Sequence, residues 1–441
     1  MEHDMTSGNI TRQIFLFSLP IVMGNIFQQL YNTADAIIVG QMIGKDAFAA
    51  VSVANPIMSV VLFFLVGLSM GVGILLAQKY GAKDLDTFRR QYSTALIAGV
   101  LFTLISALLC ILCSRWMLKA ANTPVEILDI TDHYLKIIFV GMFFSFLYNY
   151  FASALRAIGD SRASFIFLVI SSLVNILLDI IFVTQTPLGV IGAALATVLS
   201  QALSASLCII YIYRTCPLMA LRLHEFVFVS GELKSILIFS WASALQQTFL
   251  YFGRLLVQGT INAHGTDMIT GYNAAIRLES FIMAFIDGTG NAIGSFAGQN
   301  KGANKPARLK TGLFKTFQLN FIWVIFCGIL MLSIPQLLIG LFVDTSNTAA
   351  IQLGITYIKI MPVFYLLCAT MSAIQGFFRG VGKNKITMIA TGMQIATRCI
   401  LALLLVPRYG IYGVCISVII GWVLMLSYDG ILCIKYLKSL C

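Results

Sequence analysis

The sequence predicts an all-α integral membrane protein with twelve transmembrane helices, arranged as two six-helix bundles around a central cavity. Three observations predict this fold class. The composition is apolar with few charges, the chain contains twelve apolar runs long enough to cross a bilayer, and its second half repeats motifs of its first half.

The composition excludes an ordinary soluble domain. Of 441 residues, 59% are hydrophobic and only 11% are charged, whereas soluble domains contain about 25% charged residues. The net charge of +11 would suggest nucleic acid for a soluble chain, but membrane proteins place basic residues in their cytoplasmic loops. We therefore expect a lipid bilayer and no nucleic acid as partner. Most of the ten cysteines fall inside apolar runs without ligand spacing, which indicates small apolar residues.

Twelve apolar runs are long enough to be transmembrane helices, since a helix crosses a bilayer with about 20 residues. They cover approximately 13–40, 48–77, 92–114, 134–156, 162–184, 189–213, 234–262, 269–297, 310–334, 351–378, 386–406 and 411–436. The longest connection is "RTCPLMALRLHEFVFVSGEL", which has an amphipathic pattern. It predicts three parts: an N-terminal lobe at 1–213, a cytoplasmic linker at 214–233 and a C-terminal lobe at 234–441.

Basic residues predict the orientation. They concentrate in the connections that share a side with both termini, and basic residues favour the cytoplasmic side. The two clearest clusters contain Lys79, Lys83, Arg89, Arg90, Lys301, Lys305, Arg308 and Lys310. We therefore expect both termini in the cytoplasm.

The two halves repeat. "GLSMGVGILLAQKYGA" (67–82) aligns with "GTGNAIGSFAGQNKGA" (288–303), and "ALRAIGDSR" (154–162) aligns with the stretch that contains "GFFRGVGKNK" (376–385). Six spans in each half give both halves the same orientation, a transporter architecture with an axis along the membrane normal. Gly81 and Gly302 follow apolar runs and are interpreted as helix C-caps. No selectivity filter, metal-ligand spacing or nucleophile elbow is visible, so we expect neither an enzyme nor a cofactor.

The first span carries a polar face. In "MGNIFQQLYNTADAIIVG", the residues Gln28, Tyr31, Asn32 and Asp35 recur at i, i+3, i+4 and i+7, which places them on one side of a helix. One interpretation is a packing seam joined by amides. The other is the lining of a substrate cavity that contains a titratable group, and the carboxylate favours this second interpretation.

A second carboxylate interrupts "NILLDIIFV". Asn175 and Asp179 are one turn apart, at a depth similar to that of Asp35, and the next span brings Thr197 back to the depth of Asn175. A carboxylate at mid-helix costs roughly 2.5–3.5 kcal/mol on insertion scales. Two carboxylates, an amide and a hydroxyl would form an oxygen cage for a proton or for Na⁺. The alternative is four unrelated polar residues in the core.

The second half lacks this arrangement. Arg254 stands near the place that Asp35 occupies in the first half, and Arg277, Glu279, Asp287 and Arg398 follow in later spans. These charges form either structural ion pairs, together with Asp429, or a face toward the substrate, where Glu279 is the candidate. Pro20 removes a backbone hydrogen bond from the first span and predicts a kink or a hinge there.

These motifs resemble the multidrug and toxic compound extrusion (MATE) family, most closely its bacterial DNA-damage-inducible protein F branch. The resemblance covers nearly the whole chain and is carried by "LPIVMGNIFQQLYNTADAIIVGQMIG", "AQKYGAKD", "LRAIGDSR", "NILLDIIFV", "GVIGAALATVLSQ" and "GQNKGA". It implies two six-helix lobes, a V-shaped cavity between them and alternating access driven by protons or sodium.

The resemblance also implies roles for individual residues. The cation site of this branch matches Asp35, Asn175, Asp179 and Thr197 here, a bending proline matches Pro20, and a tyrosine one turn before the first aspartate matches Tyr31. Another branch has a glutamate in its seventh helix, where this chain offers only an arginine. A cation site in the C-terminal lobe is therefore not expected.

The expected function is a cation-coupled antiporter, using H⁺ or Na⁺, that exports small organic and often cationic amphipathic compounds. The expected location is the bacterial inner membrane, and the expected state is a monomer. The alternatives are a lipid-linked oligosaccharide flippase of the same superfamily and a transporter of the major-facilitator type, which also has two six-helix halves.

Overall fold

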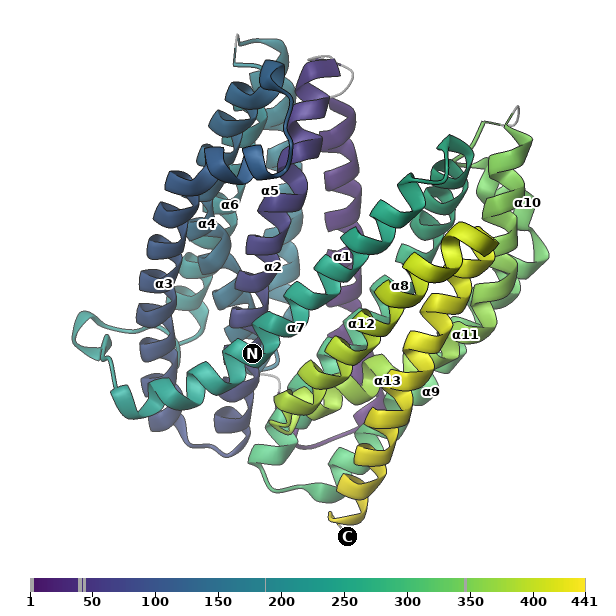
Figure 1. Cartoon of the computed structure of the whole chain (residues 1–441). Coiled ribbons are helices and arrows are strands. Elements are labelled where there is room, and N and C mark those ends of the chain that lie inside the picture. The colour runs from purple at the N-terminus through teal and green to yellow at the C-terminus, as the bar shows by residue number, and fades with distance from the viewer. Residues whose placement is uncertain (1–3, 39–41, 43–44, 187, 345–346, 441) are drawn as a thin grey trace. The chain divides into compact units, whose positions relative to one another are not determined.

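The computed structural model describes residues 4–38, 42, 45–186, 188–344 and 347–440. Within these residues the regular structure is helical (Figure 1). The elements are α1 (Ile10–Ile38), α2 (Lys45–Gly81), α3 (Leu85–Ala120), α4 (Val125–Ala157), α5 (Ser161–Thr184), α6 (Val190–Thr215), the 3-10 turn η2 (Leu223–Glu225), α7 (Ser230–Asn262), α8 (Thr266–Gly302), α9 (Pro306–Ser333), α10 (Pro335–Gly340), α11 (Thr348–Gly380), α12 (Asn384–Tyr409) and α13 (Ile411–Lys438).

The predicted spans are confirmed within the described residues, since each falls on one long helix; positions 39 and 40 of the first predicted span lie outside the described residues. Within the described residues, 10 helices are long and apolar enough to cross a membrane. The two other long helices are α7 and α8, which carry Arg254, Arg277, Glu279 and Asp287. Most helices extend beyond the predicted runs because their polar ends continue the backbone hydrogen bonding outside the apolar segment. The short helix α10 was not predicted.

The chain forms two compact units that do not follow the order of the sequence. The first unit contains Met1–Asp4 and Met23–Thr248, and the second contains Met5–Val22 and Phe249–Cys441. The helices α1 and α7 are therefore each divided between the units. The lobe boundaries proposed from the sequence, 1–213 and 234–441 with a linker between them, stay a prediction.

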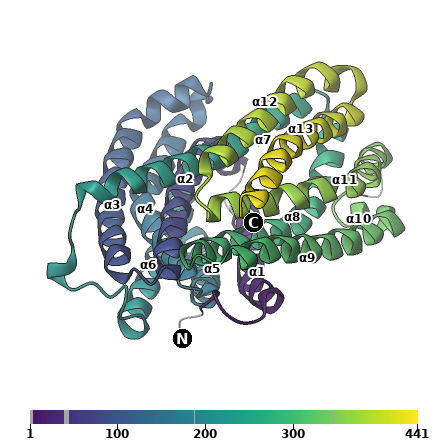
Figure 2. The same cartoon turned by 90° about the horizontal axis from the view of Figure 1, so that it is seen from below.

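In the first unit, α4 packs against α2, α3, α5 and α6, and α3, α4 and α6 run side by side in both views (Figures 1 and 2). Aromatic side chains fill the space between α3 and α4: the ring centroids of Tyr92 and Tyr150 are 5.4 Å apart. The first part of α7 lies close to α2, because a Cβ atom at Gly67 would be only 2.5 Å from Cα of Ala244.

The second unit is built around the crossing of α8 and α11. Glycines line this crossing, and a Cβ atom at Gly376 would overlap the carbonyl oxygen of Gly290. The segment before α1 belongs to this unit. Met5 donates its backbone N–H to Oε1 of Gln299 over 2.9 Å, and the guanidinium of Arg308 donates to the carbonyl oxygens of Met5 (3.0 Å) and Gly8 (2.9 Å).

The turns confirm the internal repeat. Backbones with positive φ recur at matched positions of the two halves: Lys83 (57°) and Asn304 (53°), Gly159 (92°) and Gly382 (82°), Gly189 (52°) and Gly410 (55°). The C-cap interpretation of Gly81 and Gly302 was wrong. Both are the last helical residues, and the left-handed residue lies two positions later, where the backbone turns to close the helix.

Candidate functional site

The first unit contains a buried carboxyl and a buried amide with no partner. Asp179 and Asn175 lie one turn apart on α5, with 0% and 1% of their surfaces exposed. Among the residues that the structure describes, neither oxygen of Asp179 and neither amide atom of Asn175 has a hydrogen-bond partner. A buried unsatisfied polar group costs about 1–3 kcal/mol, and more when it is charged. Burying these polar groups without a hydrogen-bond partner is therefore unfavourable, and a bound proton or cation would lower that cost.

Asp35 on α1 lies close enough to Asp179 for the two carboxyl groups to interact electrostatically. Oδ1 of Asp35 is also buried and unpartnered. Within the described part of the chain, no Lys, Arg or His nitrogen lies within 4.0 Å of either carboxyl group. Ionised carboxylates only accept hydrogen bonds, so a proton or a cation must lie between two such groups. The structure thus brings Asp35 and Asp179 together, and their role as a coupling site stays a prediction.

Two tyrosines lie near this pair. Tyr31 is on the same helix as Asp35, interacts electrostatically with both carboxyl groups, and makes a side-chain hydrogen bond with Gln28. Tyr134 on α4 is 4% exposed and lies within electrostatic range of both carboxyl groups and of Tyr31. Sequence reasoning missed Tyr134, because its neighbours in "TDHYLK" are charged and obscure an inward-facing hydroxyl.

The other predicted site residues have different outcomes. Thr197 donates its hydroxyl to the carbonyl oxygen of Ala193 on its own helix at 3.0 Å, which leaves the oxygen lone pairs available but does not join it to the carboxyl pair. Gln28 is exposed, and Pro20 is buried within α1. The side chain of Asn32 lies outside the described residues. The cavity role of Gln28 and Asn32 and the hinge role of Pro20 stay predictions.

Glu279 in the second unit is held by two tyrosines of α11. Tyr357 donates its hydroxyl to Oε2 of Glu279 at 2.7 Å, and Tyr365 donates to the same oxygen at 3.0 Å. Both tyrosines are fully buried, whereas Glu279 is half-buried. Tyr272 packs edge-to-face on Tyr357, with ring centroids 5.7 Å apart. The structure thus gives Glu279 neutral donors that neither the composition nor the spacing had indicated.

The arginines of the second unit do not form the ion pairs that one interpretation expected. Among the described residues, no carboxylate oxygen lies within 4.0 Å of Arg254, Arg277 or Arg398. Asp429 accepts a hydrogen bond from the amide of Gln375 instead. Arg254 and Asp287 interact at longer range and both are exposed. Charged side chains are costly in lipid, so we expect this surface of the second unit to face water rather than lipid.

The comparison with protein families decides the identity of the chain. The model of the MatE family matches residues 20–181 and matches again at 242–404. The chain belongs to the MatE family. The two matches correspond to the two halves of the internal repeat, and MATE proteins are membrane transporters rather than enzymes.

Curated MATE relatives align along most of their length. The probable multidrug resistance protein YpnP of Bacillus subtilis (strain 168) is 29% identical over 382 residues, which are 86% of this chain and 84% of the relative. The probable multidrug resistance protein NorM of Thermotoga maritima is 26% identical over 93% of this chain and 89% of its own length. The multidrug export protein MepA of Staphylococcus aureus (strain N315) is 24% identical over 92% and 89%.

Solved MATE structures share the fold. A MATE protein crystallised in complex with MaL6 superposes with a TM-score of 0.92 at 23% identity, over 99% of both chains. A transporter of the MOP superfamily from Pyrococcus furiosus, whose binding pocket is described as having reverse polarity, gives a TM-score of 0.91 at 22% identity over 99% and 98%. The MATE fold of twelve membrane helices in two lobes is therefore confirmed. The more specific branch stays a prediction.

Proposed function

We propose that this MATE transporter exports small organic, often cationic amphipathic compounds by cation-coupled antiport, and that Asp35 and Asp179 form its coupling site. The observation that carries the proposal is the carboxyl pair, whose two groups interact electrostatically. Both oxygens of Asp179, Oδ1 of Asp35 and the amide of the neighbouring Asn175 have no hydrogen-bond partner among the described residues. A site of this kind changes its charge by one when it gains a proton or a monovalent cation. The names of the multidrug relatives support the substrate class.

The mechanism follows from the cost of an unneutralised pair. Two carboxylates that are close together and removed from water cannot both stay ionised without a proton or a cation. The buried arrangement is therefore destabilised while both carboxylates are ionised and no ion is bound. Binding of a proton or a cation favours the conformation that buries the pair. If one conformation buries the pair and the other exposes it, the ion gradient shifts the equilibrium between them. Substrate export follows when the two conformations open to opposite sides of the membrane.

The proposal is tested by reconstituting the protein in liposomes and measuring export of a fluorescent cationic dye under separate pH and Na⁺ gradients. We expect either the pH gradient or the Na⁺ gradient to drive accumulation of dye against the concentration gradient of the dye. Equal, non-concentrative dye movement under both gradients and under none would contradict coupled antiport. Movement of labelled lipid-linked oligosaccharide in the same liposomes, without dye export, would instead support the flippase alternative.

Substitution of two neutral side chains tests whether the coupling ion is H⁺ or Na⁺. Asn175→Ala and Thr197→Ala each remove an oxygen that Na⁺ needs as a ligand and a proton does not. If Na⁺ is the coupling ion, each change should weaken Na⁺ dependence about 5- to 150-fold, which corresponds to the loss of a buried polar partner. If H⁺ is the ion, which we favour because the carboxyl pair suffices for it, the changes should mainly shift the pH midpoint of transport. Stimulation by Na⁺ at fixed pH, abolished by Asn175→Ala, would overturn the proton assignment.

The exposed charges of the second unit are proposed to contact substrate. Arg254→Gln should alter the preference between cationic and anionic dyes while the melting temperature changes little, since Arg254 has no close ion pair to lose among the described residues. Glu279→Gln is the matched comparison, because Glu279 accepts two buried hydroxyls. Unlike Arg254→Gln, Glu279→Gln should lower the melting temperature in addition to altering dye preference. If Arg254→Gln lowers the melting temperature and leaves dye preference intact, the arginine is structural.

A further inference from the structure

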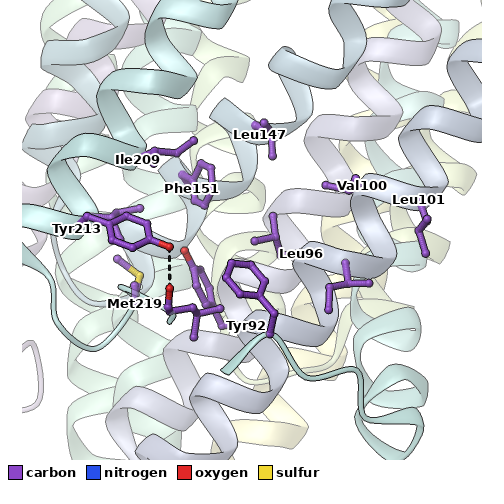
Figure 3. A pocket seen from close by; sticks show the side chains of 13 residues that line it. Tyr92, Leu96, Val100, Leu101, Leu147, Phe151, Ile209, Tyr213 and Met219 are labelled. Atoms are coloured by element: carbon purple, nitrogen blue, oxygen red, sulfur yellow. Dashed lines mark hydrogen bonds between the residues drawn. The ribbon is translucent and has the colours of Figure 1, made fainter. Parts of the chain in front are cut away.

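The first unit contains an apolar cavity whose lining does not include Asp35 or Asp179. It has a volume of about 410 Å³, which lies within the range of small-molecule sites. It lies among α3, α4, α6 and the linker that follows α6. The side chains that line it include Leu96 and Val100 of α3, Leu147 of α4, Ile209 and Tyr213 of α6 and Met219 of the linker (Figure 3).

The linker is fastened over this cavity by hydrogen bonds to α3. Arg89 donates to the carbonyl oxygens of Leu218 (3.2 Å) and Pro217 (3.1 Å) and forms an ion pair with Glu225 at 2.9 Å. The backbone N–H of Val227 donates to Oγ of Ser93 at 2.8 Å. These bonds hold the linker along the start of α3.

A further hydrogen bond joins the end of α6 to the linker at the edge of the cavity. The hydroxyl of Tyr213 donates to the carbonyl oxygen of Leu221 at 2.7 Å (Figure 3). The ring of Tyr213 contributes to the lining, while over half of the residue's surface is exposed. Tyrosine favours a boundary with an apolar and a wet side. The cavity therefore ends at such a boundary.

The outer surface of the linker combines apolar and basic side chains. Leu223 is 93% exposed, and Val227 and Phe228 are exposed by 45% and 48%. Arg214 and Arg222 are also exposed, and, within the described residues, no carboxylate lies within 4.0 Å of either guanidinium group. Glu225 accepts a hydrogen bond from the backbone N–H of Arg222 at 2.7 Å and forms its ion pair with Arg89. Exposed apolar and basic residues together are typical of segments that lie in the interface of an anionic membrane.

We propose that the cavity binds an acyl chain of an anionic phospholipid, whose phosphate is neutralised by Arg214 and Arg222. The lining is almost entirely apolar, so it disfavours water. The chain spans a membrane, and Leu101 contributes to the lining while 54% of it stays exposed, which leaves the cavity open toward lipid. The exposed guanidinium groups of Arg214 and Arg222 complement the negative charge of a phosphate. A bound lipid would join the linker to α3, α4 and α6.

The test uses the purified full-length protein in nanodiscs that contain phosphatidylglycerol with a photoreactive group at the end of one acyl chain. We expect crosslinks within residues 92–101 and 209–213. Leu96→Trp should abolish them by filling the cavity, whereas Leu104→Trp, which lies on the same helix, is 49% exposed and does not line the cavity, should retain them. Val100→Phe is the second filling variant and replaces Leu96→Trp if that protein does not fold.

The head group is tested separately. Arg214→Gln and Arg222→Gln should each lower the preference for phosphatidylglycerol over phosphatidylcholine by about fivefold and retain the crosslinked positions. Crosslinks outside the two segments, or equal labelling of Leu96→Trp and Leu104→Trp, would overturn the proposal. Displacement of the lipid probe by a transported dye would assign the cavity to substrate instead. None of these measurements requires transport, so they stand or fall independently of the antiport proposal.

Discussion

Asp35→Asn is expected to abolish gradient-driven export and leave the protein folded. The change retains the shape of the side chain but removes the carboxylate that lies beside Asp179. Ion binding would then no longer neutralise a pair of carboxylates. Stability should be unchanged or higher, because an ionised carboxylate in a membrane span costs roughly 2.5–3.5 kcal/mol on insertion scales. The measurements are dye accumulation in liposomes under each gradient and the melting temperature in detergent.

Asp132→Asn is the matched control. Asp132 is also a buried carboxyl of the first unit, but it has partners: Lys136 at 2.7 Å and Ser114 at 2.5 Å. Removing its charge should lower the melting temperature, since Lys136 loses its ion pair, and should leave the ratio of driven to passive dye movement intact. Driven export by Asp35→Asn at the wild-type level would remove Asp35 from the coupling site.

Gly376→Ala is expected to prevent accumulation of folded protein. An added Cβ atom would overlap the carbonyl oxygen of Gly290 on the facing helix, and neither backbone can withdraw without separating α8 from α11. Overpacking of a core typically costs 1–3 kcal/mol, and a clash between two backbones in a helix crossing should exceed that range. The measurements are the yield of protein in the membrane and its size-exclusion profile.

Gly259→Ala serves as the control on α7. No atom lies within 4 Å of a Cβ atom built at Gly259, so this change should have no steric cost. Alanine is also a better helix former than glycine by about 1 kcal/mol. We expect wild-type yield or slightly more. Normal yield and melting temperature for Gly376→Ala would mean that the crossing of α8 and α11 tolerates separation.

The candidate site was only partly readable from the sequence. Asp35 and Asp179 could be singled out because an ionisable residue in a long apolar run is costly and therefore conspicuous. Tyr134 could not, because tyrosine is common in membrane helices and no local pattern states which way its hydroxyl points. The tyrosines around Glu279 were missed for the same reason, since α11 approaches α8 only in the folded chain.

By itself, the sequence determined the number of spans, their type and their repetition in two halves. These are consequences of apolar run length and of local turn residues, which act within a few positions of the chain. Only the tertiary structure decided that α1 and α7 are divided between two compact units, that Asp35 meets Asp179, and that Arg254 has no close carboxylate among the described residues. Such pairings depend on which helix faces meet. An apolar helix face packs about as favourably against lipid as against another helix, so hydrophobicity does not specify which faces meet. Close contacts at glycines and the shapes of side chains must therefore decide the pairing of helices.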